Sequence, residues 1–110
     1  MANSPGTYPV QLTMGATVTA TLTGASNYFY LALSGGNVTT LSFSTADVQN
    51  PETVWLVIKQ DSSARTVGFA SNIVTNSLVV STTINSTTVM EFFYDTSTQQ
   101  WFLMELGKTG

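Results

Sequence analysis

The sequence predicts an all-β protein, an antiparallel β-sandwich of jelly-roll type with eight or nine short strands. Apolar and polar residues alternate in several segments, most regularly in residues 16–23, as in a strand with one wet face. Turn-forming residues recur at short intervals between these segments, and no segment has a helical apolar period; this pattern is typical of a sandwich or small barrel. Because no connection is long enough for a crossover helix, antiparallel pairing is expected.

The first half of the chain contains four predicted strands. Residues 8–14 and 16–23 alternate between apolar and polar side chains. Residues 28–33 are apolar throughout, so we expect both faces of this strand to be covered. The Ser-Gly-Gly-Asn sequence at residues 34–37 favours a tight turn, because Gly and Asn tolerate positive φ angles. Residues 38–43 then form the returning strand.

The second half begins with a long apolar segment, residues 53–60, which we expect to be a central strand. Two short strands follow, at residues 66–70 and 77–81. The chain closes with a hairpin of two aromatic-rich strands, residues 89–94 and 101–106. Aromatic residues suit a half-buried pleated surface, and the short polar residues between these strands suit a turn.

Two phenylalanines are candidate subunit contacts. Alternation within the hairpin places Met90, Phe92 and Tyr94 on the core face and Phe93 on the other face. A bulky apolar residue there is either a lone exposed side chain or part of a second covered surface, as Phe29 would be in the apolar strand. Only 8% of the residues are charged, against roughly 25% in ordinary soluble domains. Because charge keeps protein surfaces apart, we expect a homo-oligomer, a trimer around one axis.

Composition excludes several function classes. The formal net charge is −3, and the basic residues are Lys59, Arg65 and Lys108. This argues against nucleic-acid binding and against a polybasic membrane contact. No run approaches the roughly 20 apolar residues that span a bilayer, and the N-terminal sequence does not resemble a secretory signal. The chain has no Cys and no His, so we predict no disulfide. No spacing resembles a calcium loop or a phosphate loop, and we predict no metal site and no cofactor.

The side chains permit one enzyme class, a glycosidase with paired carboxylates. Glu91 and Glu105 lie on neighbouring strands of the hairpin and could face each other. Two solvated strand carboxylates are the simpler interpretation, and we predict no catalytic residues and no enzyme. Aromatic residues could instead stack on a sugar, although in strands rich in Val and Leu they more often belong to the core. These residues are Tyr8, Tyr28, Tyr30, Trp55 and Trp101.

A set of motifs resembles a β-sandwich module of tailed-bacteriophage virion proteins, which include head-decoration proteins, head fibres and tail fibres. The motifs are a strand ending in Gln60-Asp61, a polar turn, Thr-Val-x-Phe at residues 66–69, and Phe-x-Tyr-Asp at residues 92–95 followed by Trp101. Members usually have Gly in the turn, where this chain has Ser63-Ala64, and residues 17–43 fit more loosely. The resemblance implies a non-enzymatic structural domain, commonly trimeric, on the surface of a virion.

We therefore expect a capsid decoration (cement) protein that binds the outer capsid surface and stabilises the shell. A chain with room for one sandwich and a short arm favours this role over a tail fibre. The expected partners are the major capsid protein and other copies of this chain. The expected location is the capsid surface of the virion, after synthesis in the host cytoplasm. The alternatives are a tail-fibre or head-fibre receptor-binding module that adheres to carbohydrate, and a free carbohydrate-binding module.

The N-terminal segment is the candidate capsid contact. Residues 1–7 have no periodic pattern and form a predicted extended arm, while residues 8–110 form a single β-sandwich domain. Pro5 and Pro9 favour extended conformations suited to lying along a strand edge; a free terminus is the equally weighted alternative. The candidate contact residues are Asn3, Ser4, Pro5, Gly6, Thr7 and Tyr8.

Overall fold

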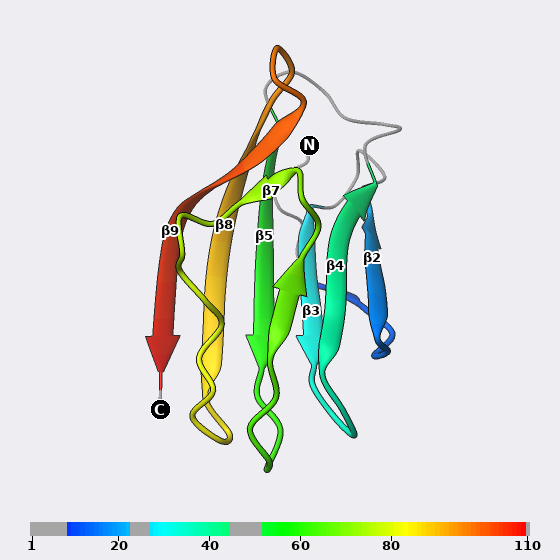
Figure 1. Ribbon diagram of the computed structural model, residues 1–110, viewed down its shortest axis with the longest axis vertical. Helices are drawn as coiled ribbons and strands as arrows, with labels where there is room; N and C mark the ends of the chain where they lie inside the picture. Colours follow the sequence, from blue (N-terminus) through cyan, green and yellow to red (C-terminus); the bar gives the residue numbers. More distant parts are fainter. Residues whose placement is uncertain (1–8, 23–26, 45–51, 110) are drawn as a thin grey trace.

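The computed structural model describes residues 9–22, 27–44 and 52–109. Nine strands in these segments form two sheets packed face to face, which confirms the all-β prediction (Figure 1). The six-stranded sheet has the order β1-β3-β5-β8-β9-β7 and the three-stranded sheet the order β2-β4-β6. The strands are β1 (Val10–Gln11), β2 (Thr17–Thr21), β3 (Tyr28–Ala32), β4 (Val38–Ser44), β5 (Glu52–Lys59), β6 (Val67–Phe69), β7 (Ile73–Val74), β8 (Thr87–Asp95) and β9 (Gln100–Thr109).

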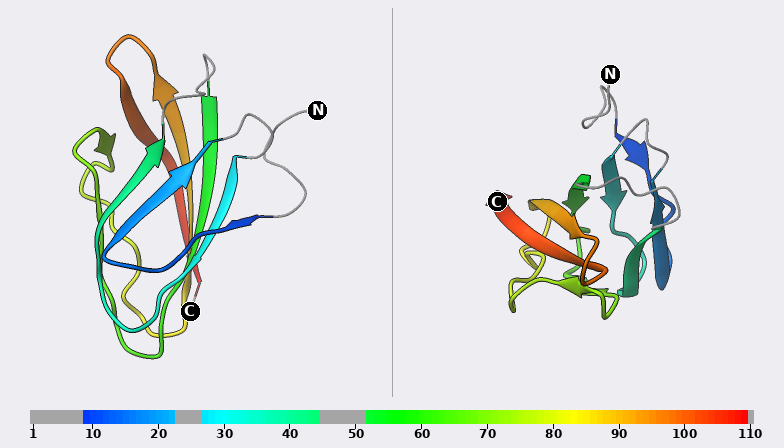
Figure 2. Two further views of the ribbon diagram at one scale, coloured as in Figure 1. Left: turned by 90° about the vertical axis from the view of Figure 1, so that its right-hand side faces the viewer. Right: turned by 90° about the horizontal axis from the view of Figure 1, so that it is seen from above.

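The strand pairing differs from the predicted antiparallel jelly roll. Consecutive strands from β1 to β6 alternate between the two sheets, so neighbours within a sheet are parallel. Among the described strands, antiparallel pairing occurs in β5–β8 and β8–β9, whereas β7 runs parallel to β9. A short turn reverses the chain, but it does not decide which sheet the next strand joins. Here the turn at residues 34–37 crosses to the facing sheet, and the two layers are separate in Figure 2.

The segment after β6 also differs from the sequence prediction. Residues 77–81 do not form a strand, and the short strand β7 lies earlier, at Ile73–Val74. Asn76 and Ser77 have φ angles of 55° and 69°, which interrupt an extended backbone. Val80 is buried, while Leu78 and Val79 are exposed. The segment therefore covers the core with a single apolar side chain.

Aromatic rings fill the centre of the core between the sheets. Phe43 from β4 contacts Phe92 of β8 and Trp101 of β9, with ring centroids 5.2 and 4.9 Å apart and edge-on geometry. Tyr94 packs against Trp101 at 4.8 Å. Met90, Phe92 and Tyr94 are buried as alternation predicted. The C-terminal hairpin thus supplies the aromatic contacts of the large sheet with β4.

Phe29 belongs to this core and cannot be a subunit contact. Its side chain is 0% exposed, and it points between the sheets together with Leu31 and Leu33. On the other face of β3, Tyr28 and Tyr30 are half-buried and Ala32 is exposed. The apolar run therefore does not have two covered faces, because alternation still places one set of its residues at the surface.

Gly68 is required by a close backbone approach. A Cβ atom at this position would lie 2.5 Å from the carbonyl oxygen of Thr39. The approach occurs where the β4–β6 register shifts between Val38 and Leu41. The x of the Thr-Val-x-Phe motif is therefore occupied by the one residue without a Cβ.

We expect Gly68→Ala to destabilise the protein by about 1–3 kcal/mol, because the added methyl group forces β6 away from β4. Urea unfolding measures the effect. Gly36→Ala is the matched control, since a Cβ there meets no atom within 4 Å and φ is not in the left-handed region. Equal stability of the two variants would contradict the close approach.

Candidate functional site: the outer face of the large sheet

The outer face of the six-stranded sheet carries a row of two aromatic and two acidic side chains that runs across four strands. Tyr28 on β3 pairs with Trp55 on β5, Trp55 pairs with Glu91 on β8, and Glu91 pairs with Glu105 on β9. Paired residues on adjacent strands point to the same face of a sheet. Two aromatic rings and two carboxylates therefore lie side by side, although they come from four separate strands.

The aromatic end of this row borders a shallow depression, which we call the aromatic depression. Tyr28, Trp55, Val57 and Val89 line it, and its volume is about 350 Å³. Val89 is 43% exposed, and the other three side chains are half-buried. From strands rich in Val and Leu, the sequence predicts that the aromatic residues more often belong to the core. That assignment is right for Trp101 but wrong for Tyr28 and Trp55, which the strand alternation places outside.

A second apolar area lies on the C-terminal hairpin, and we call it the hairpin patch. It consists of Phe93, Phe102 and Met104. Phe93 and Phe102 are cross-strand partners and both are half-buried. Met104 is 60% exposed, because the β8–β9 register shifts beside it and leaves it without a partner. Phe93 thus faces outward as alternation predicted, next to a second phenylalanine that the sequence reasoning had not considered.

The carboxylates of Glu91 and Glu105 do face each other across β8 and β9, as the hairpin suggested. Glu91 is half-buried and Glu105 is exposed. Neither side chain forms an ion pair with a cation of the described residues. Like charges directly opposite each other are unfavourable in a sheet. A glycosidase acid needs a dry pocket, and an exposed pair on an open sheet face does not provide one.

The outer face of the three-stranded sheet has a different character. Its side chains are hydroxyl groups in register between β2 and β4. The cross-strand pairs are Thr17 with Thr40, Thr19 with Ser42, and Thr21 with Ser44. The two outer faces of the sandwich are thus chemically distinct, one apolar with carboxylates and one lined by small alcohols.

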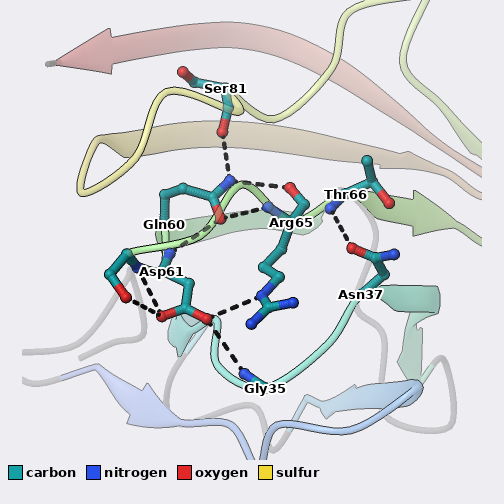
Figure 3. Close-up of polar contacts among 8 residues, drawn as sticks. Gly35, Asn37, Gln60, Asp61, Arg65, Thr66 and Ser81 are labelled. Atoms are coloured by element: carbon teal, nitrogen blue, oxygen red, sulfur yellow. Dashed lines mark hydrogen bonds and ion pairs between the residues drawn. The ribbon is translucent and has the colours of Figure 1, made fainter.

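A polar cluster at one end of the sandwich, the polar clamp, joins three connections (Figure 3). The side chain of Gln60 is 3% exposed. Its Nε2 donates to the carbonyl oxygens of Arg65 (3.0 Å) and Ser81 (2.8 Å). Its Oε1 accepts from the backbone N–H groups of Asp61 (3.0 Å) and Arg65 (2.9 Å). All hydrogen-bonding positions of this buried amide are used, so its role is structural.

Asp61 extends the polar clamp to the neighbouring turn. Its Oδ2 accepts from Arg65 Nε at 2.9 Å and from the Gly35 N–H at 3.3 Å, and its Oδ1 accepts from the Ser62 N–H at 2.7 Å. Gly35 has a φ of 76°, a conformation that glycine adopts without strain. The hydrogen bond from Arg65, followed by that from the Ser62 N–H, lowers the pKa of Asp61 below its ordinary value.

Asp95 has a similar role in the turn between β8 and β9. Its Oδ2 accepts from the Thr98 hydroxyl at 2.8 Å. Its Oδ1 accepts from the Ser97 hydroxyl at 2.9 Å and from the Ser97 N–H at 3.2 Å. These bonds, with that from Thr98 the largest contribution, lower the pKa of Asp95. The turn holds the two long strands whose outer side chains form the hairpin patch.

Within residues 9–22, 27–44 and 52–109, no three acidic, His or Cys side chains are grouped so that they could hold a metal ion. The same residues contain no helix long and apolar enough to cross a membrane. The candidate capsid contacts, residues 3–8, lie outside the described part of the chain.

Comparisons with protein families, curated proteins and solved structures find no match to this chain.

We expect Gln60→Glu to destabilise the protein by more than about 2 kcal/mol at neutral pH, because the new carboxylate would face two carbonyl oxygens that lose their donor. Urea unfolding at pH 7 measures the loss. Gln99→Glu is the control, since Gln99 lies exposed in the β8–β9 turn. Equal stability of both variants would show that the hydrogen bonds of the Gln60 amide do not stabilise the fold.

Stability should also fall in acid, and part of the fall should come from Asp61 and Asp95. Both pKa values lie below the ordinary value of 3.8 in the folded protein, so the unfolded chain takes up these protons first. The stabilisation is present above the unfolded value of 3.8 and is lost as pH falls through the folded pKa values. Chemical unfolding from pH 6 to pH 2 should show a shallower decline in the Asp61→Asn, Asp95→Asn double variant. Parallel profiles would contradict this assignment.

Proposed function

We propose that the protein is a non-enzymatic virion structural protein of a tailed bacteriophage, a decoration protein that binds the outer capsid surface and stabilises the shell. The observation that carries the proposal is the uncovered hairpin patch in a chain with only 8% charged residues. The motifs around Gln60-Asp61 and in the hairpin resemble those of virion modules, and this resemblance supports a location on a virion.

Self-association is the first part of the proposal. Phe93, Phe102 and Met104 form an apolar area that extends across both strands of the hairpin. Contiguous exposed apolar surface usually marks a contact with another molecule. Burial of this area around a symmetry axis would remove it from water in every copy at once. A homotrimer is the assembly that the resemblance implies, and Phe93 is its proposed contact.

Capsid binding is the second part. A protein that binds the assembled lattice better than its free subunits stabilises the lattice by mass action. A trimer binds the capsid more tightly than a single copy, because its second and third contacts become intramolecular. The proposed contact is the arm, residues 3–8.

We also propose that the protein is not an enzyme, because of where its polar and acidic side chains lie. The buried polar residue Gln60 uses its hydrogen bonds within the fold, and Asp61 and Asp95 hold turns. The remaining paired carboxylates, Glu91 and Glu105, lie on an open sheet face. Gln60, Asp61 and Asp95 thus have structural roles, and the open position of the Glu91–Glu105 pair lacks the enclosed setting that acid catalysis needs.

A receptor-binding module that adheres to carbohydrate is the second candidate. The aromatic depression favours it, because half-buried aromatic rings on an outer face beside a carboxylate suit the binding of a sugar. The rings of the depression come from β3 and β5, with Val89 of β8 at its border, whereas the hairpin patch lies further along β8 and on β9. The two candidate functions therefore use different parts of one face.

We expect the native chain to sediment as a trimer, three times its 11.8 kDa mass, and to bind capsids that lack it. Phe93→Glu should shift it to monomers, because the trimer would bury an unpaired charge. Deletion of residues 1–7 should leave the trimer intact but abolish capsid binding. Analytical ultracentrifugation and co-sedimentation with capsids measure the two properties.

Thr19→Glu is the matched control for Phe93→Glu, because it adds the same charge on the outer face of the other sheet. It should retain assembly and capsid binding. Circular dichroism must show that each variant is folded. A native chain that stays monomeric at micromolar concentration would refute the proposed self-association. A native chain that does not co-sediment with capsids would refute the proposed capsid binding.

A further inference from the structure

We propose that the aromatic depression is a binding site for one ring of a neutral sugar, with Glu91 as the acceptor for its hydroxyl groups. The inference gives a ligand class and residues to the second candidate function. It is independent of capsid binding, because either a decoration protein or a fibre module can carry such a site.

The apolar half of the site comes from two parallel strands. Tyr28 and Trp55 are register partners on β3 and β5, and adjacent strands lie about 4.8 Å apart. Their side chains therefore stand next to each other on one face. Val57 and Val89 complete the lining. The C–H face of a sugar ring is apolar and slightly positive, so it suits the negative face of an aromatic ring. The volume, about 350 Å³, is at the lower end of the range for small-ligand sites.

The polar half continues the same row. Glu91 is the register partner of Trp55 on the next strand, and Glu105 follows it on β9. Neither carboxylate has an ion-pair partner among the described residues. Two adjacent acceptors without a cation are complementary to a ligand that carries several donors. Sugar hydroxyl groups supply such donors, and hydrogen bonds to a carboxylate are stronger than those between neutral groups.

Charge also selects the class of sugar. The nearest cation along β5 is Lys59, whose Nζ donates to the carbonyl oxygen of Asn85 at 2.6 Å. Lys59 lies four residues beyond Trp55 along the strand. An acidic sugar in the depression would therefore meet the two carboxylates beside Trp55, while the Lys59 ammonium, two residues beyond Val57 on the same face, is held by the carbonyl oxygen of Asn85. We expect neutral sugars to bind and uronic acids to be rejected.

The two tryptophans of the chain provide a built-in probe and control. Trp101 is fully buried and packs against Phe43 and Tyr94, whereas Trp55 is half-buried on the outer face. The experiment titrates ¹⁵N-labelled full-length protein with cellotriose, chitotriose and trigalacturonate, and follows both indole N–H signals by NMR. At least one neutral trisaccharide should shift the Trp55 signal while the Trp101 signal stays in place, and trigalacturonate should shift neither.

Variants then test the residues. Trp55→Thr should weaken binding of the neutral trisaccharide about tenfold or more, since the stacking surface is lost. The isosteric Glu91→Gln should weaken it several-fold and reduce the discrimination against trigalacturonate. Should Trp55→Thr not fold, Tyr28→Ser removes the other ring, and its loss of affinity supports the site equally. Phe102→Thr, in the hairpin patch, is the matched control and should bind sugar normally even where it weakens assembly.

Three outcomes would overturn the proposal. The first is that neither neutral trisaccharide shifts the Trp55 signal. The second is that the depression variants bind the sugar as tightly as the native chain. The third is that Trp55→Thr prevents self-association and no sugar binds, which would show that the depression is a contact between copies. Failure of capsid binding with sugar binding retained would refute the decoration role and leave the site intact.

Discussion

The passage of consecutive strands from one sheet to the other is the constraint on which the rest of this structure depends. It makes β1, β3 and β5 parallel neighbours in the large sheet, and β2, β4 and β6 parallel neighbours in the small one. Such crossings leave turns that cannot be held by hairpin hydrogen bonds. The polar clamp holds two of these turns, the β3–β4 and β5–β6 connections, through the carboxylate of Asp61 and the buried amide of Gln60.

Local pattern predicted most of the strands and the core face of the hairpin, because alternation depends only on neighbouring residues. Pairing was not predictable in the same way, since a four-residue turn fits both a hairpin and a crossing between sheets. Phe29 shows the consequence: an apolar run suggests two covered faces, and only the sheet order reveals which face is inside. The aromatic depression could not be predicted from the sequence either, because Tyr28 and Trp55 become neighbours only through the parallel β3–β5 pairing.

The motifs that resemble virion modules have structural explanations in this chain. Gln60 and Asp61 join connections, and Gly68 permits the close approach of Thr39. Residues 62–65, the turn in which the modules that these motifs resemble usually have Gly, contain no positive φ angle, so Ser63 and Ala64 fit without strain. Motifs of this kind carry information about the fold. On the outer face, Tyr28 and Glu91 lie outside these motifs, and Phe93 occupies the variable position of Phe-x-Tyr-Asp.

The carboxylates of Glu91 and Glu105 limit how the outer face can be used. On β8, Glu91 lies between Val89 of the aromatic depression and Phe93 of the hairpin patch. A subunit that covered the whole face would bury both charges without a cation, and desolvation costs several kcal/mol per ion. Contact confined to the hairpin patch avoids this cost and leaves the carboxylates at its wet rim. Self-association through Phe93 and an open aromatic depression are therefore compatible on a single sheet.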